Sequence, residues 1–242
     1  MANSEEGHRA VWRALNLVED WLSTGFAGEH PDLVIDAPPE APRAPAAPPA
    51  GREDPPQDRA AALAEVASEV ASCAKCDLAP GRTTTVPGEG AIDPPVLFIG
   101  EGPGAEEDRT GRPFVGAAGQ YLETWLSPIG LSRSQSFIAN CVKCRPPQNR
   151  EPHPGEIAAC LPYLERQIAA VRPRVICCLG RIAAQTLLGT SASLGELRGR
   201  AHERNGIPVV VTYHPSAVLR DKAALRKPVW EDLKLLKHLL EQ

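Results

Sequence analysis

Residues 96–104 read Val96-Leu97-Phe98-Ile99-Gly100-Glu101-Gly102-Pro103-Gly104, a short apolar run that ends in a glycine-rich turn. Three other apolar runs are also rich in β-branched residues and too short for helices, namely residues 137–139, 175–179 and 208–212. Helical patterns lie near residues 117–128, 154–171, 181–188 and 228–241. Strands that alternate with helices predict an α/β fold, a three-layer sandwich with a central four-stranded parallel sheet and helices on both faces.

The residues that close the four predicted strands are unusual. The first strand leads into the turn 100–104, the second ends at Asn140, the third is followed by Gly180, and the fourth enters Thr212-Tyr213-His214-Pro215-Ser216-Ala217. Ligands bind at the carboxyl ends of the strands in an open parallel sheet, so we expect all four loops to line one crevice. Gly100 and Gly102 would let the backbone approach a flat ligand there.

Three side chains of this crevice suggest chemistry on a heterocyclic base. Phe114 lies between glycine-rich turns and fits a stacking platform. The amide of Asn140 both donates and accepts hydrogen bonds and could read a pyrimidine edge, although an asparagine is equally ordinary in a turn. His214 is held extended by Pro215 and could stabilise an oxygen that gains negative charge. The acids 106–108 could orient a water or simply complement a helix dipole.

Four of the seven cysteines have the spacing of metal ligands. Cys73 and Cys76 form a CxxC pair, and Cys144 and Cys160 form a second, distant pair. One turn can supply two thiolates to a centre, and the distant pair can complete the four ligands. The odd number of cysteines favours a reducing cytoplasm over a disulfide framework, and the other three are expected to be free.

The first 59 residues differ from the rest in composition. Residues 1–36 contain an amphipathic pattern at 8–24, and residues 37–59 form a Pro/Ala-rich linker with eight prolines. This front part carries a net charge of −6, whereas residues 60–242, the predicted globular domain, carry +2. The sequence shows no secretory signal and no apolar run long enough for a membrane span. We therefore expect a cytoplasmic protein.

These segments together resemble the family 4 uracil-DNA glycosylases, the iron–sulphur branch of that superfamily. The resemblance extends over about residues 70–240 and rests on the cysteine spacing and on four ordered motifs: residues 100–104 with Glu107-Asp108, Gly111-Arg112-Pro113-Phe114-Val115-Gly116, residues 140–150, and residues 213–217. It implies a monofunctional enzyme of base excision repair that hydrolyses the N-glycosidic bond of uracil in DNA and leaves an abasic site. The nucleotide would be flipped out of the duplex.

The resemblance also implies roles for individual residues. Phe114 would stack on uracil, Asn140 would read its edge, and His214 would stabilise the uracil anion. Leu219 and Arg220 would wedge the duplex and grip a phosphate.

Further residues of the family motifs surround these. Cys73, Cys76, Cys144 and Cys160 would hold a 4Fe–4S cluster that pins the loop with Arg145 and Arg150 near DNA. The attacking water would be positioned by Glu101, Glu107 or Asn149, with Glu107 and Asn149 preferred.

Other interpretations remain open from the sequence. One is a superfamily member that binds uracil-DNA covalently, and another is a non-catalytic nucleic-acid-binding module with zinc on the four cysteines. The helix at 8–24 could bind a protein partner in either case. The expected protein is a monomer that acts on uracil-containing DNA at the bacterial nucleoid.

Overall fold

The computed structural model describes residues 56–242, and these contain a six-stranded mixed sheet with helices on both faces. The predicted helix at 8–24 and the linker up to residue 55 lie outside this part of the chain. No helix within it is long and apolar enough to cross a bilayer.

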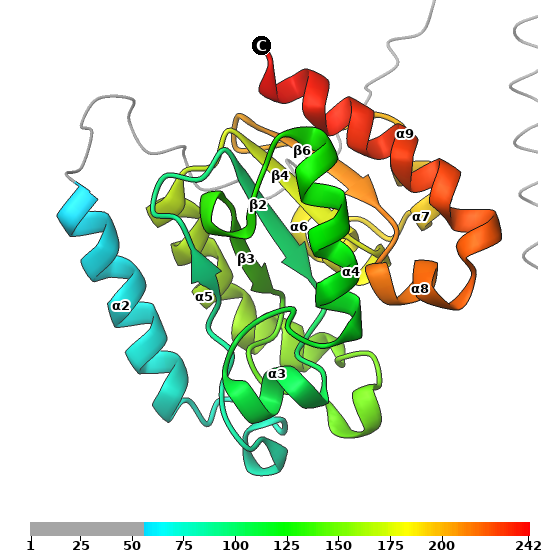
Figure 1. Ribbon diagram of the computed structural model, residues 1–242. Helices are drawn as coiled ribbons and strands as arrows, with labels where there is room; N and C mark the ends of the chain where they lie inside the picture. Colours follow the sequence, from blue (N-terminus) through cyan, green and yellow to red (C-terminus); the bar gives the residue numbers. More distant parts are fainter. Residues whose placement is uncertain (1–55) are drawn as a thin grey trace, which may run out of the picture. The chain divides into compact units, whose positions relative to one another are not determined.

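The sheet has the strand order β1-β3-β2-β4-β6-β5. Figure 1 labels the four strands in the middle of this order, β3, β2, β4 and β6. Its parallel strands are those expected from the apolar runs, β2 (Val96–Gly100), β3 (Phe137–Asn140), β4 (Val175–Leu179) and β6 (Ile207–Thr212). Two antiparallel edge strands, β1 (Glu89–Gly90) and β5 (Ala201–Arg204), make six strands rather than four. Neither strand was predicted, because β1 has only two residues and β5 lacks an apolar run.

The α-helices are α2 (Pro56–Ser72), α3 (Ala105–Thr110), α4 (Ala117–Leu126), α5 (Pro154–Val171), α6 (Arg181–Leu188), α7 (Leu194–Leu197), α8 (Pro215–Arg220) and α9 (Lys222–Leu240). Short 3-10 helices occur at η1 (Ala79–Gly81), η2 (Ser127–Ile129), η3 (Arg133–Gln135) and η4 (Pro147–Asn149). The predicted bounds of α5 and α6 are confirmed. Helix α9 begins six residues before the expected start, because Pro228 lies inside it and not at its first turn.

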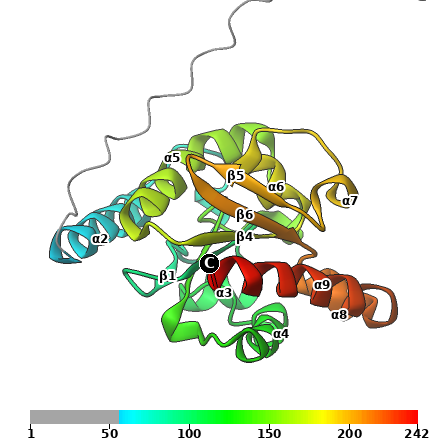
Figure 2. The ribbon, with the colours of Figure 1, turned by 90° about the horizontal axis from the view of Figure 1, so that it is seen from above.

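Alternate residues of each buried strand face two separate cores. Val96 and Phe98 pack with side chains of α4, α8 and α9, whereas Leu97 and Ile99 pack with side chains of α5, α6 and α7. Seen from above, the two groups of helices lie on opposite sides of the sheet (Figure 2). The carboxyl ends of β2, β3, β4 and β6 therefore meet at one edge of a layered structure.

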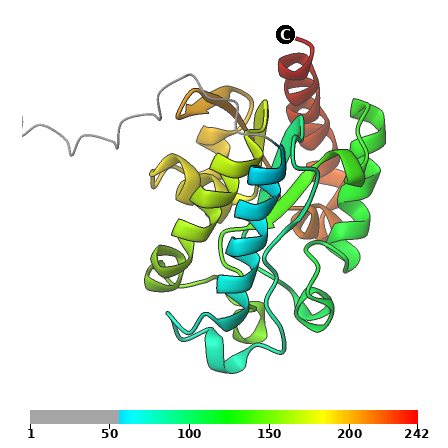
Figure 3. The same ribbon diagram turned by 90° about the vertical axis from the view of Figure 1, so that its left-hand side faces the viewer.

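Helix α2 packs against α5 (Figure 3) and begins four residues before the expected Ala60. Its start is fixed by Arg59, whose side chain donates to the carbonyls of Ile92 at 2.6 Å, Ala170 at 2.7 Å and Val171 at 2.6 Å. An arginine assigned to the linker from composition alone thus attaches the first turn of the helix to the loop before β2 and to the C-terminal end of α5.

Candidate active site

A pocket of about 500 Å³ opens at the carboxyl ends of the parallel strands. Glu101 after β2, Asn140 at the end of β3 and His214 after β6 all line it, together with Phe114. Gly180, after β4, does not. It lies behind His214, where a Cβ atom would come within 3.2 Å of the His214 Cβ. Three of the four expected loops form the pocket, and the fourth supports it from behind.

Phe114 and Asn140 meet above the end of β2 because residue 100 is glycine. A Cβ atom on Gly100 would lie 2.4 Å from Asn140 Oδ1 and 2.6 Å from Phe114 Cζ, closer than real Cβ contacts allow. Asn140 is only 2% exposed, and its Oδ1 has no hydrogen-bond partner within residues 56–242. An unpaired buried acceptor costs about 1–3 kcal/mol, so this oxygen is poised to accept from a ligand. Gly102 also approaches closely, because a Cβ there would lie 2.8 Å from Val142 Cγ2.

His214 is the N-cap of α8 and lies 5.6 Å from the Phe114 ring, measured between ring centroids. The backbone N–H of Ser216 donates to His214 Nδ1 at 3.2 Å, and Ser216 Oγ lies 2.8 Å from the same nitrogen. A nitrogen that accepts carries no proton, so the neutral ring has its proton on Nε2. Burial, aided by the charge of Arg220 and opposed by Glu107, lowers the pKa of His214 to about 4. The site thus holds a neutral imidazole with one N–H donor.

Glu107 lines the pocket, but its carboxylate is occupied by the backbone. Its Oε2 accepts from Gly104 N at 3.1 Å, and its Oε1 accepts from Val115 N and Gly116 N, both at 2.8 Å. These three bonds join the start of α3 to the segment that carries Phe114. Glu107 is therefore a structural anchor of the pocket wall, a role that its position at a helix start did not reveal.

Glu101 has a different environment. Burial, followed by repulsion from Glu151, raises the pKa of Glu101 to about 7, and Arg181 opposes the rise. A carboxylate with a pKa near neutrality is suited to general base catalysis. Asn149 also lines the pocket, but it is exposed and its Oδ1 accepts from Arg145 Nε at 2.8 Å.

Three arginines and one leucine were expected to contact DNA, and only two of these four residues line the pocket. Arg220 and Arg150 line the pocket, and Arg150 also forms an ion pair with Glu156 at 2.6 Å. Arg145 and Leu219 do not line it, and Arg145 instead holds Asn149. The cationic groups at the pocket are therefore Arg220 and a partly neutralised Arg150.

The four predicted metal-ligating cysteines surround one small hollow beside α2 and α5. Arg82 Nη1 donates to Cys144 Sγ at 3.4 Å, and the backbone N–H of Lys143 donates to Cys160 Sγ at 3.3 Å. Burial raises the pKa of Cys160 to about 11. No three His, Cys, Asp or Glu side chains within residues 56–242 converge closely enough to bind one metal ion. Four thiols around one hollow are a donor set that fits the four-cysteine ligation of an iron–sulphur cluster.

Two residues of the site were missed by the sequence reasoning. Ser216 holds the His214 ring, and the order His-Pro-Ser could have indicated this, because proline favours the first helical position and so makes His214 the cap. Lys143 is 1% exposed, and its Nζ donates to the Asn140 carbonyl at 2.9 Å and to Gln167 Oε1 at 2.6 Å. A lysine next to a predicted ligand cysteine gave no sign that it would be buried.

Comparison with known proteins places this geometry in a family. Residues 87–234 match the uracil DNA glycosylase superfamily. A type-4 uracil-DNA glycosylase of Pyrobaculum aerophilum is 48% identical over 172 residues, which cover 68% of this chain and 87% of that protein. The type-4 enzyme of Sulfurisphaera tokodaii is 44% identical, over 73% of this chain and 84% of its own. That of Archaeoglobus fulgidus is 43% identical, over 73% and 92%. The chain belongs to the uracil DNA glycosylase superfamily.

Proposed function

We propose that this protein is a monofunctional DNA glycosylase that hydrolyses the N-glycosidic bond of uracil in DNA and leaves an abasic site, the entry step of base excision repair. The names of its type-4 relatives support this activity. The observation that carries the proposal is the buried, unpaired Oδ1 of Asn140 beside Phe114. Uracil would offer its ring N–H to that oxygen and its neighbouring carbonyl to the amide N–H, whereas cytosine presents the opposite pattern.

Base capture would require the nucleotide to leave the duplex and enter the pocket. Phe114 would stack on the flipped base, an interaction that contributes about 1–3 kcal/mol per base in proteins that bind single strands. Gly100 and Gly102 would leave room for the base next to the backbone. Leu219 would fill the space left in the duplex, and Arg220 would bind a phosphate.

Bond cleavage would leave negative charge on the uracil oxygen. His214 would donate from Nε2 to that oxygen, since Nδ1 is already occupied by Ser216. One such preorganised donor is worth about 3–4 kcal/mol in the transition state. A pKa of about 4 keeps the ring neutral at physiological pH, so it acts as a hydrogen-bond donor without first losing a proton.

The attacking water would be activated by Glu101. Its pKa of about 7 supports this role, and the carboxylate of Glu107 is engaged with three backbone amides. Asn149 would help to orient the water through its amide N–H, because its oxygen accepts from Arg145. Arg150 and Arg145 would contribute positive charge near the DNA backbone.

The cysteine hollow would hold a 4Fe–4S cluster on Cys73, Cys76, Cys144 and Cys160. The cluster would cross-link α2, α5 and the segment after β3, which are distant in sequence. Its contribution would be structural, because the segment from Cys144 leads directly to Asn149 and Arg150 at the pocket.

The glycosylase would be the domain 60–242, acting as a monomer on chromosomal DNA in the cytoplasm. The segment 8–24, outside the part that the structure describes, would bind a protein partner, and the linker would tether it to the glycosylase domain.

The test is excision from an oligonucleotide with one uracil, followed by alkali cleavage at the abasic site. We expect cleavage with uracil and none with cytosine at the same position. His214→Ala should slow single-turnover excision at least about a hundredfold. The matched control is His238→Ala, an exposed histidine on α9, which should retain the wild-type rate. Absence of alkali-sensitive product from the wild-type protein would refute the proposal, and a protein–DNA adduct stable on a denaturing gel would instead support covalent binding.

A further inference from the structure

Phe114 has a backbone conformation that a bulky residue adopts only under constraint. Its φ angle is +50°, in the left-handed region. For a residue with a side chain, this conformation is less stable than the right-handed one and persists only where the surroundings enforce it. The direction of the Phe114 ring depends on that backbone, and charged side chains contact the peptide groups on both sides of it.

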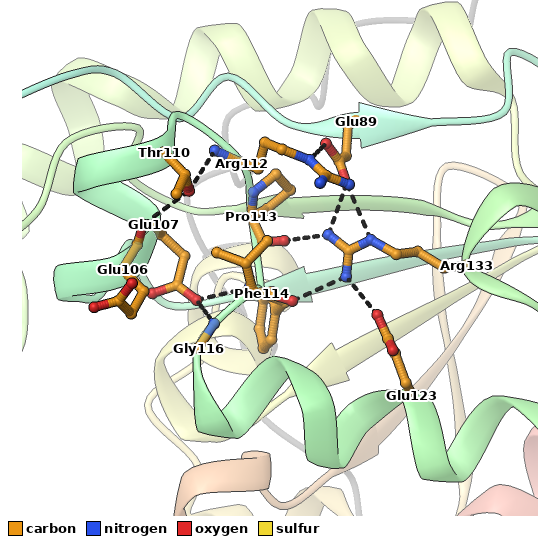
Figure 4. Close-up of polar contacts among 11 residues, drawn as sticks. Glu89, Glu106, Glu107, Thr110, Arg112, Pro113, Phe114, Gly116, Glu123 and Arg133 are labelled. Atoms are coloured by element: carbon orange, nitrogen blue, oxygen red, sulfur yellow. Dashed lines mark hydrogen bonds and ion pairs between the residues drawn. The ribbon is translucent and has the colours of Figure 1, made fainter.

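Arg133 holds the carbonyl groups on this segment. It lies on η3, just before β3, and its Nη1 donates to the Phe114 carbonyl oxygen at 2.9 Å. Its Nη2 donates to the carbonyl of Pro113, so one guanidinium binds two consecutive carbonyls (Figure 4). Gly119 of α4 adds close contact, because a Cβ atom there would lie 1.9 Å from the Phe114 oxygen.

Glu107 holds the amide groups on the other side of the same residue. The N–H groups of Val115 and Gly116 both donate to its Oε1. A cation therefore fixes the carbonyls of residues 113 and 114, and an anion fixes the amides of residues 115 and 116. The peptide units before and after the left-handed residue are both held by charged side chains.

Arg133 is itself held by Glu89 on the short edge strand β1. Glu89 Oε1 accepts from Arg133 Nε at 3.0 Å and from Nη2 at 2.7 Å. The side chain of Arg133 is 18% exposed and that of Arg112 is 59% exposed. The ion pair of Glu89 with Arg133 is therefore better shielded from water than that of Glu89 with Arg112. Arg112 contacts the same carboxylate but donates to neither carbonyl of the Phe114 segment.

We propose that Arg133 is a positioning residue for base capture: it enforces the left-handed conformation of Phe114 and so directs the ring into the pocket. The inference deepens the proposed uracil excision and rests on it. Arg133 would touch neither the base nor the reacting atoms, and Glu89 would act one step further away by orienting Arg133.

The experiment compares Arg133→Gln with Arg112→Gln in the full chain. The first readout is hydrogen exchange of the peptide that covers residues 113–119, which needs no substrate and contains neither substituted residue. Arg133→Gln should speed its exchange, and Arg112→Gln should leave it unchanged. The second readout is single-turnover excision as a function of enzyme concentration. Arg133→Gln should lower the efficiency of excision about tenfold, as expected if the competent Phe114 conformer becomes a minor state.

A double-mutant cycle separates positioning from general destabilisation. In a Phe114→Ala background, Arg133→Gln should change the efficiency of excision less than about twofold, because the ring that Arg133 positions is absent. Arg133→Lys, which keeps the charge but loses the planar fork, serves if the glutamine variant does not fold, and it should show the same exchange and cycle behaviour. Additive effects of Arg133→Gln and Phe114→Ala on excision, or unchanged exchange of residues 113–119 in Arg133→Gln, would overturn the inference. If Arg133→Gln exchanges faster but the wild type never excises uracil, the proposed function is refuted, whereas the role of Arg133 in holding the Phe114 backbone is supported.

Discussion

Replacing His214 by asparagine should remove a specific acid sensitivity from the folded protein. The side-chain oxygen of asparagine can take over the N-cap hydrogen bond from Ser216 N, so the start of α8 is kept while the titrating ring is lost. In the folded state the pKa of His214 is about 4, against 6.5 for an ordinary histidine. Between these two values the unfolded chain binds a proton that the folded protein does not, so folding stability is lost as the pH falls through that window.

The size of the effect follows from the same shift. A histidine whose pKa falls by this amount on folding lowers the free energy of unfolding by at most about 3 kcal/mol. The full loss is reached once the pH is below the pKa values of both the folded and the unfolded state. Solvent reaches the ring through the pocket, so about 2 kcal/mol is the better expectation. Arg220 and Glu107 are the charged groups that act on the ring, and neither is altered by the substitution.

The assay is urea unfolding of the wild type and of His214→Asn at about pH 7.5 and about pH 4, at constant salt. We expect the wild type to lose about 2 kcal/mol more than the variant between these pH values. His238→Asn removes an exposed histidine and should show the same pH dependence as the wild type. The carboxylates are the same in all three proteins, so their contribution cancels in the comparison. Equal pH dependence in the wild type and in His214→Asn would refute a buried neutral histidine.

Two further predictions concern the general base Glu101 and the predicted ligand cysteines. Because the pKa of Glu101 is raised to about 7 by burial and by Glu151, the excision rate should increase with pH up to that value, and Glu151→Gln should move the rise to lower pH. A rate profile that Glu101→Gln leaves unaltered would exclude this residue as the base. Cys160→Ala should abolish the visible absorbance and bound iron of the purified protein and lower its unfolding temperature, whereas Cys177→Ala should keep the iron. Full iron content in Cys160→Ala would show that the ligand assignment is wrong.

The parallel strands and the position of the pocket could be predicted because they depend on local signals. Apolar runs bounded by glycine, asparagine and histidine mark β2, β3 and β6, and parallel strands bring such ends together. The extended backbone expected for His214 before Pro215 is confirmed, with ψ of 138°. The contacts that hold the pocket wall in place join residues far apart in sequence, such as Glu89 with Arg133. The spacing of apolar residues along the chain does not predict such pairs.

The same limit explains the uncertainty over the acids. Glu101 and Glu107 are both glutamates within one glycine-rich stretch, and composition cannot tell them apart. Their different behaviour arises from tertiary contacts: three amides surround Glu107, whereas Glu101 faces Glu151 and Arg181 from other segments. A distinction of this kind becomes visible only when the chain has folded.

The strand order has a consequence for how the enzyme is made. Strand β6, which leads into His214, pairs with β4 inside the sheet although it is synthesised long after β2 and β3. A ribosome-bound chain that has emerged only as far as α6 contains Phe114 and Asn140 but not the histidine. Because domains generally fold as units, and because Phe114 shares its core with Val210, Val218 and Leu233, a nascent chain of this length carries the residues that bind the base but has not yet folded into the pocket. Catalytic competence therefore arises only after β6, α8 and α9 have left the ribosome.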